Sequence, residues 1–299
     1  FLGDFIAVGA DFRMQGFSYT DTTSNKQKTA IFPMQADIYT NIEINDKASL
    51  YYKLGLGPIP KHEYWVIFPV LPNDGWLRIG RTLPNYGFKV DDHTSFIRGG
   101  NLTSITPDDT DLDTGLFLNP QLINIPISFE TGLVLTDDIR LNIGISNGFI
   151  TSSDSQDMVN YSASLNFNKG FNNFSLLSGI SYMKELDINS TGIFGGFSIN
   201  KLTFSYELDK TNNWIGSNES IASYAQIVVK PTQGLHLIAK YDSFDKDVDF
   251  ATGSIDRYSV GFEIYPLNIL EIKFQVRKHE SEDFPDLDNE CLVQVHTWF

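Results

Sequence analysis

The stretch FPMQADIYTNIEI, residues 32–44, alternates apolar and polar side chains along most of its length. One face of an extended chain would carry the apolar side chains from Phe32 to Ile44, and the opposite face would carry Gln35, Asp37 and Glu43. Alternation with period two predicts a β-strand with one apolar and one polar face. A strand in a soluble domain usually has about 5 or 6 residues, whereas a strand that crosses a bilayer needs about 9 to 11. This stretch is long enough to cross a membrane.

The same pattern recurs along the chain, and its apolar face carries no charge. An uncharged face suits lipid and a charged face suits water, so the alternation favours a membrane barrel over a soluble sandwich. We expect Ile38, Phe129, Leu141, Phe204 and Phe262 to face outward. The alternating segments are 6–15, 49–56, 123–133, 139–146, 159–167, 202–208, 235–242, 257–264 and 270–277.

The connections between these segments are short and long in turn. Seven short turns alternate with eight longer polar links, which predicts sixteen strands, and the less regular stretches 62–69, 173–183 and 191–199 leave fourteen to eighteen open. The fold class is therefore all-β: a transmembrane antiparallel up-and-down barrel, in a single domain over residues 1–299. The expected longer links are 19–30, 57–62, 82–120, 147–158, 184–191, 209–219, 243–254 and 279–290.

Composition excludes several other classes. The net charge is −15, from 22 Lys and Arg against 37 Asp and Glu, so a nucleic-acid partner is excluded because phosphate binding needs a basic surface. The single cysteine, Cys291, allows no internal disulfide, and neither a metal nor a cofactor is expected. No apolar run reaches the roughly 20 residues of a membrane helix. The start of the chain lacks the features of a signal peptide, so we expect any such segment to have been removed.

The end of the chain alternates from Cys291 to Phe299. A last strand that ends in Phe resembles the assembly signal of the outer-membrane barrels of Gram-negative bacteria, and the likeness to the porin class covers the whole chain. The resemblance implies a location in the bacterial outer membrane, in contact with the lipid bilayer and lipopolysaccharide. It also implies that the barrel-assembly machinery recognises Phe299.

Charged side chains on the polar faces are the candidate pore lining. Their signs nearly balance, which predicts a weak preference for either ion sign, since selectivity needs rings of one sign. Alternatively, the charges pair between neighbouring strands and stiffen the wall. With Asp11 and Glu271 on the same strip, the candidates are Arg13, Asp37, Glu43, Lys53, Arg78, Glu130, Arg140, Glu207, Lys240, Arg257, Glu263, Lys273 and Arg277.

The longest link, residues 82–120, begins Thr-Leu-Pro-Asn-Tyr-Gly-Phe after the strand residues Arg78 to Arg81. This start resembles phosphate- and carbohydrate-type porins, in which a long loop folds inward and narrows the pore. The alternative is an extracellular, solvated loop held by its own ion pairs. If the loop folds inward, its constriction residues are Arg81, Asp91, Asp92, His93 and Arg98.

The favoured function is a porin-like channel for passive diffusion of small hydrophilic solutes or ions. The alternative is a barrel that serves as a scaffold or sheath for a protein partner, such as a multihaem cytochrome. Adhesion through the acidic runs 108–113, 245–249 and 282–288 is a third hypothesis, and these runs are expected to be solvated rather than to bind Ca²⁺. An enzyme is not expected, because Ser146-Asn147-Gly148 resembles an outer-membrane phospholipase motif without the upstream His that would activate the serine.

Overall fold

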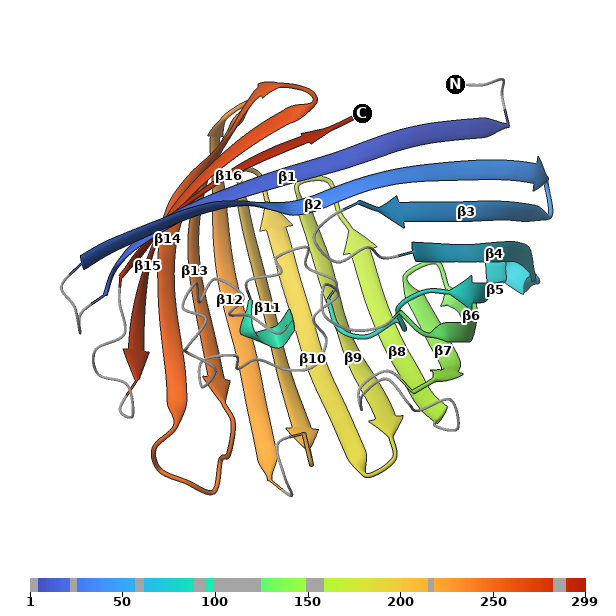
Figure 1. Ribbon diagram of the computed structural model, residues 1–299. Helices are drawn as coiled ribbons and strands as arrows, with labels where there is room; N and C mark the ends of the chain where they lie inside the picture. The colour runs from blue at the N-terminus through green and yellow to red at the C-terminus, as the bar shows by residue number, and fades with distance from the viewer. Residues whose placement is uncertain are drawn as a thin grey trace.

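Sixteen β-strands among the described residues form one closed antiparallel barrel, in which neighbours in sequence pair and β1 pairs with β16 (Figure 1). The predicted fold class and strand number are confirmed. The computed structural model describes residues 5–21, 26–56, 62–88, 95–98, 125–148, 159–214, 218–281 and 289–299. The strands are β1 (Ile6–Asp21), β2 (Lys26–Asn45), β3 (Ala48–Gly55), β4 (His62–Leu71), β5 (Gly75–Arg81), β6 (Ile127–Thr136), β7 (Ile139–Asn147), β8 (Val159–Gly170), β9 (Phe174–Glu185), β10 (Ile188–Ile199), β11 (Leu202–Asn212), β12 (Glu219–Thr232), β13 (Leu235–Asp245), β14 (Ser254–Leu267), β15 (Leu270–Ser281) and β16 (Glu290–Trp298).

Apolar side chains cover the outside of the barrel. Ile38, Phe129 and Phe262 are 42%, 43% and 37% exposed, and the alternate positions on their strands face inward. Leu141 and Phe204 share the outer faces of β7 and β11, so the predicted orientation of all five residues is confirmed. None of the helices in the described part of the chain is long and apolar enough to cross a membrane.

The prediction for the start of the stretch 32–44 was wrong, because Phe32 does not share the outward face of Ile38. The register of β1 and β2 shifts between Arg13 and Met14, so that Arg13 pairs with Gln35 but Met14 pairs with Pro33. An extra residue in one strand reverses which side chains face outward beyond it. As a result Ile31 is 72% exposed, whereas the ring of Phe32 lies 5.7 Å from the ring of buried Phe17.

The two ends of the barrel differ in the length of their connections. The turns at 46–47, 72–74, 137–138, 171–173, 200–201, 233–234 and 268–269 lie at one end, together with the start of β1 and the end of β16 (Figure 1). The predicted link at 184–191 is wrong, because only Leu186 and Asp187 separate β9 from β10. Two polar residues of that stretch lie on the inner faces of long strands: Asn160 donates a hydrogen bond to Glu185, and Ser190 contacts Thr211.

The buried apolar core lies inside the barrel. Two short 3₁₀ helices interrupt the strands, η1 (Pro72–Asp74) in a turn and η2 (Phe96–Arg98) in the long link after β5. Figure 1 shows η2 within the ring of strands, and it contacts β11, β12 and β13. The core residues are Phe96, Ile97, Ala222, Tyr224, Phe244 and Ile255.

Candidate pore and the loop segment inside it

The chain turns into the barrel where it leaves β5. The backbone N–H of Thr82 donates to the carbonyl of Pro126 at 3.1 Å, and Arg81 Nε donates to the carbonyl of Ile125 at 2.8 Å. The backbone N–H of Asn85 then donates to Glu130 Oε1 on the inner face of β6 at 3.1 Å. These bonds attach the start of the link to the wall beside β5.

Tyr86 contacts a different part of the inner wall, at β10 and β11. Its hydroxyl lies 2.7 Å from Ser190 Oγ on β10 and 3.2 Å from Asp209 Oδ1 on β11. Burial raises the pKa of the Tyr86 phenol well above its usual value, and the nearby negative charge of Asp209 raises it further. The hydroxyl therefore stays protonated and can donate a hydrogen bond to the carboxylate.

Gly87 occupies a position that only glycine fits. Its backbone has φ +65°, and a Cβ there would lie 1.9 Å from Glu207 Oε1. Its N–H donates to Ser181 Oγ on β9 at 2.7 Å. The absence of a side chain lets the segment lie directly against the carboxylates of β11.

Arg98 joins the far side of this segment to the same carboxylates. Its Nη2 lies 2.8 Å from Glu207 Oε1, and its Nη1 lies 3.4 Å from Asp209 Oδ2. The same Nη2 donates to the carbonyl of Phe88 at 2.9 Å. Arg98 is only 5% exposed. Its guanidinium therefore anchors the loop segment, residues 82–88 and 95–98, and is not available to a solute in the pore.

A second contact lies on β13 and β14. Ser95 Oγ donates to Asp242 Oδ1 at 2.7 Å, and Asp242 also lies 3.1 Å from Lys240 Nζ and 3.2 Å from Arg257 Nη2. The ring of Phe96 covers Arg257, whose Cζ is 4.4 Å from the ring centroid. Solvent is excluded from this part of the inner wall.

The inner wall of β4–β6 carries a stacked arginine. Arg78 Nε donates to Glu130 Oε2 at 2.9 Å, and its Cζ lies 5.5 Å from the ring centroid of Trp65 and 5.4 Å from that of Trp76. Trp65 in turn stacks on Tyr51 with ring centroids 4.8 Å apart. These side chains are only partly buried, apart from Glu130, so this part of the inner wall is accessible to solvent.

Further ion pairs line the wall on either side of the β1–β16 seam. Lys53 Nζ lies 3.0 Å from Glu63 and 3.8 Å from Asp37. The His296 ring bridges Asp11 at 3.0 Å and Glu271 at 3.2 Å. Other pairs join Arg13 to Asp11, Lys273 to Glu263 and Arg277 to Glu290.

The candidate pore-lining residues all lie on inner faces of strands, and the structure separates them by exposure. Glu43 and Arg140 are exposed. Asp91, Asp92 and His93 lie outside the described residues. The buried candidates are Arg13, Glu130, Glu207, Lys240, Arg257 and Arg277. The partly exposed ones are Asp37, Lys53, Arg78, Glu263 and Lys273.

Sequence reasoning missed residues that hold the loop segment. Tyr86 and Ser190 were not selected, and the predicted strand stopped at 208, whereas β11 extends to Asn212. Continuing the alternation of period two from Glu207 would have placed Asp209 on the inner face. Asp242, on the polar face of β13, was likewise left out of the candidates.

The acidic run 245–249 organises its own loop. Asp245 Oδ1 accepts a bond from the N–H of Asp247 at 3.1 Å, and Asp247 Oδ1 accepts one from the N–H of Asp249 at 3.2 Å. Asn218 Nδ2 donates to the other oxygen of Asp247. Across the described ranges, no group of three or more His, Cys, Asp or Glu side chains could hold a metal ion.

Solved porin structures resemble this barrel over nearly its whole length. The Salmonella typhi OmpF complex with daunomycin has a TM-score of 0.66 at 13% identity, covering 98% of this chain and 97% of that chain. A high-pH structure of Pseudomonas putida OprB has a TM-score of 0.70 at 8% identity, covering 100% and 95%. An anion-selective porin from Comamonas acidovorans has a TM-score of 0.65 at 10% identity, covering 98% and 99%.

No protein-family model matches the chain, and no curated protein matches it either. At these low identities the likeness to the solved structures concerns the fold alone. The strand number, the antiparallel pairing and the closure of β1 on β16 agree with that likeness. The chain therefore has the porin fold, a closed sixteen-stranded antiparallel barrel.

Proposed function

We propose that this protein is an outer-membrane channel through which small hydrophilic solutes or ions diffuse passively. The observation that carries the proposal is a charged, ion-paired inner wall around a passage that the loop segment, residues 82–88 and 95–98, narrows from one side. Barrels of sixteen strands are wide enough to leave an aqueous channel. The outer face is apolar along the middle of the strands and carries charges such as Lys278 and Glu280 only toward the strand ends, which supports a location in a bilayer.

Charge pairing bears on the selectivity of the proposed channel. Lys53, Arg78 and Lys273 each lie against a carboxylate on the inner wall. Paired charges of opposite sign cancel at distances beyond their own separation, whereas selectivity needs rings of one sign. The channel is therefore weakly selective between anions and cations.

The loop segment that Arg98 anchors also argues against the sheath alternative. The loop segment occupies lumen volume next to β9–β14, which favours small solutes over a threaded protein partner. A hydrolase is disfavoured because Ser146 lies on β7, which pairs with β6 and β8, whereas His236 and His296 lie on the distant strands β13 and β16.

Two further parts of the proposal concern partners. Phe299 would be read by the barrel-assembly machinery during insertion. The acidic run 245–249, which begins at the end of β13 and continues into the link to β14, would meet lipopolysaccharide through divalent cations. Both follow from the proposed location in the outer membrane and are independent of conduction.

Single-channel recording in a planar bilayer tests the function. Purified protein should give discrete conductance steps, and the reversal potential under a tenfold KCl gradient should stay well below the roughly 59 mV of perfect selectivity for one monovalent ion at 25 °C. Protein denatured before addition is the control. Absence of steps, together with co-purification of a haem-stained band from native membranes, would favour the sheath alternative.

A further inference from the structure

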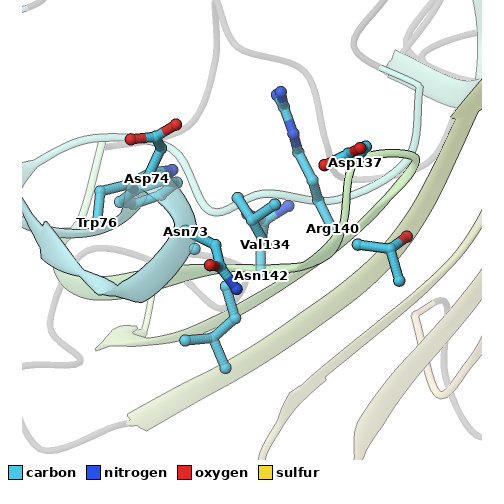
Figure 2. Close-up of a pocket in the computed structure, with 10 residues that line it drawn as sticks. Asn73, Asp74, Trp76, Val134, Asp137, Arg140 and Asn142 are labelled. Atoms are coloured by element: carbon cyan, nitrogen blue, oxygen red, sulfur yellow. The ribbon is translucent and has the colours of Figure 1, made fainter.

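A cavity of about 580 Å³ opens on the inner wall at the short-turn end of β5–β7 (Figure 2). The strand register places Trp76, Gly132 and Asn142 side by side across three strands, and Val134 beside Arg140 in the row nearer the turn. These residues form the floor of the cavity. The η1 turn and the β6–β7 turn form its sides, and they contribute Asn73, Asp74 and Asp137.

The charges of this cavity are arranged unlike those elsewhere on the wall. Arg140 is exposed and forms no ion pair with any residue that the structure describes, whereas Arg78 nearby is paired with Glu130. Asp74 and Asp137 are also exposed, and they lie on different turns. Figure 2 shows the Arg140 side chain extending between these two turns. The cavity thus offers one available cation and two separated carboxylates.

An apolar surface lies between the charges. The Trp76 indole lies across the backbone of β6 at Gly132, where an added Cβ would be 2.3 Å from the indole Cε2. Val134 continues this surface toward the turn. A side chain at position 132 would displace the indole, so the glycine sets the shape of the cavity floor.

We propose that this cavity binds small zwitterions of the α-amino-acid class as they pass; the inference names a solute class for the proposed channel and rests on that function. The carboxylate of the solute pairs with the fork of Arg140. Its ammonium group lies toward Asp74 or Asp137, and an aliphatic side chain covers Trp76. A simple anion meets two carboxylates and a simple cation meets Arg140, so a molecule with both charges fits best. A neutral sugar can hydrogen-bond to these groups but neutralises none of the three charges.

Current block by L-leucine tests the inference. Leucine should reduce the single-channel current at lower concentration than 4-methylpentanoate, which lacks the amine, or 3-methylbutylamine, which lacks the carboxylate. Arg140→Gln should raise the half-blocking concentration of leucine about tenfold, the loss expected for one charge-assisted contact of about 1.4 kcal/mol. The double variant Asp74→Asn, Asp137→Asn should do the same. Asp46→Asn, an exposed acid on another short turn, is the matched control and should leave block unchanged.

Calorimetric titration of leucine into the detergent-solubilised protein reads binding without any current, so the two proposals can fail separately. If the wild-type protein binds leucine but gives no conductance, the channel proposal is overturned and the binding site is supported. If the wild-type protein conducts ions but leucine neither blocks the current nor binds to the protein, only the binding-site proposal is overturned. Equal block by 4-methylpentanoate, equal block by glucose, or unchanged block in Arg140→Gln each overturns the zwitterion assignment.

Discussion

Arg98 is the residue whose charge joins the loop segment to the barrel wall. Its guanidinium contacts Glu207 and Asp209, both buried, and the three groups share little or no solvent. Removing one partner of a buried ion pair typically costs about 3 to 5 kcal/mol, because the remaining charges stay buried without compensation. The attachment of the segment thus depends on a side chain that the sequence suggested for a different role, as a pore filter.

Replacing Arg98 by Gln should release the segment from β11. The expected result is a larger and noisier single-channel conductance, because the passage is no longer narrowed steadily from that side. Lys278→Gln is the control: it removes a cation that pairs with Glu280 on the exposed face of β15 and should leave the conductance unchanged. A conductance equal to that of the wild type in Arg98→Gln would show that the segment does not limit flow.

Gly87→Ala tests the same attachment through the backbone. A residue with a Cβ is disfavoured by about 1 to 2 kcal/mol in the left-handed conformation, and here the added carbon would also overlap Glu207. The segment should move away from β11, with a conductance increase like that of Arg98→Gln. Gly170→Ala, where no atom lies within 4 Å of the added Cβ, is the matched control. Identical recordings from Gly87→Ala and Gly170→Ala would reject the close approach.

The contacts that hold the loop segment could not be predicted from sequence, because they join residues that are far apart along the chain. Tyr86 meets Ser190 and Asp209 across more than one hundred residues, as its hydrogen bonds show. A polar side chain on a lumen-facing position looks the same in sequence whether it faces water or a loop. Period-two alternation therefore identified the inner faces but not the part of them that is covered.

The strands show how far alternation reaches at the scale of single elements. Apolar positions at every second residue predicted most of the strands, because lipid excludes charge from one face of a strand that crosses it. The less regular stretches 62–69, 173–183 and 191–199 left the number of strands between fourteen and eighteen. The positions at which the strands end could not be predicted from this alternation. Glu185 and Ser190 are polar residues with partners inside the barrel, so β9 and β10 continue through a stretch whose composition is typical of a loop.

Ile143 is the outward residue at the middle of β7 and therefore the best position for testing the lipid-facing side of this strand. Leu141, which also faces outward, is the third residue of the strand and lies closer to its end. Arg at position 143 should lower the free energy of unfolding by about 2 to 4 kcal/mol, the cost of a cation at the bilayer midplane. Asn142→Arg, on the neighbouring inward face, should cost much less. Urea titration of the protein refolded into lipid vesicles measures both. Equal losses for the two variants would contradict the assignment of faces.

The whole molecule is closed by backbone pairing between its two ends. Residues Asp11 to Tyr19 of β1 pair with Glu290 to Trp298 of β16, and the backbone of Phe299 exchanges two hydrogen bonds with Ala10. The side chain of Phe299 is 76% exposed and adds little to internal packing. A role in recognition during assembly and a role in the stability of the finished barrel can therefore be separated.

Phe299→Ala should leave the unfolding free energy in vesicles nearly unchanged, since the ring is exposed and the backbone bonds persist. In cells the amount of protein in the outer membrane should fall severalfold if the assembly machinery reads the ring. Val295→Ala, on the same outward face of β16, is the control for loss of apolar surface. Equal membrane levels for Phe299→Ala and the wild type would remove the signal role.

The seam between β1 and β16 has a consequence for biosynthesis. A ribosome makes about 5 to 20 residues per second, so β1 waits roughly 15 to 60 seconds before its second partner strand, β16, exists. During that interval its backbone groups and apolar face are open to pairing with any other extended chain. Closure of the barrel at this seam therefore cannot begin until β16 has been translated, and until then the edge of β1 that will pair with β16 must stay free of other strands.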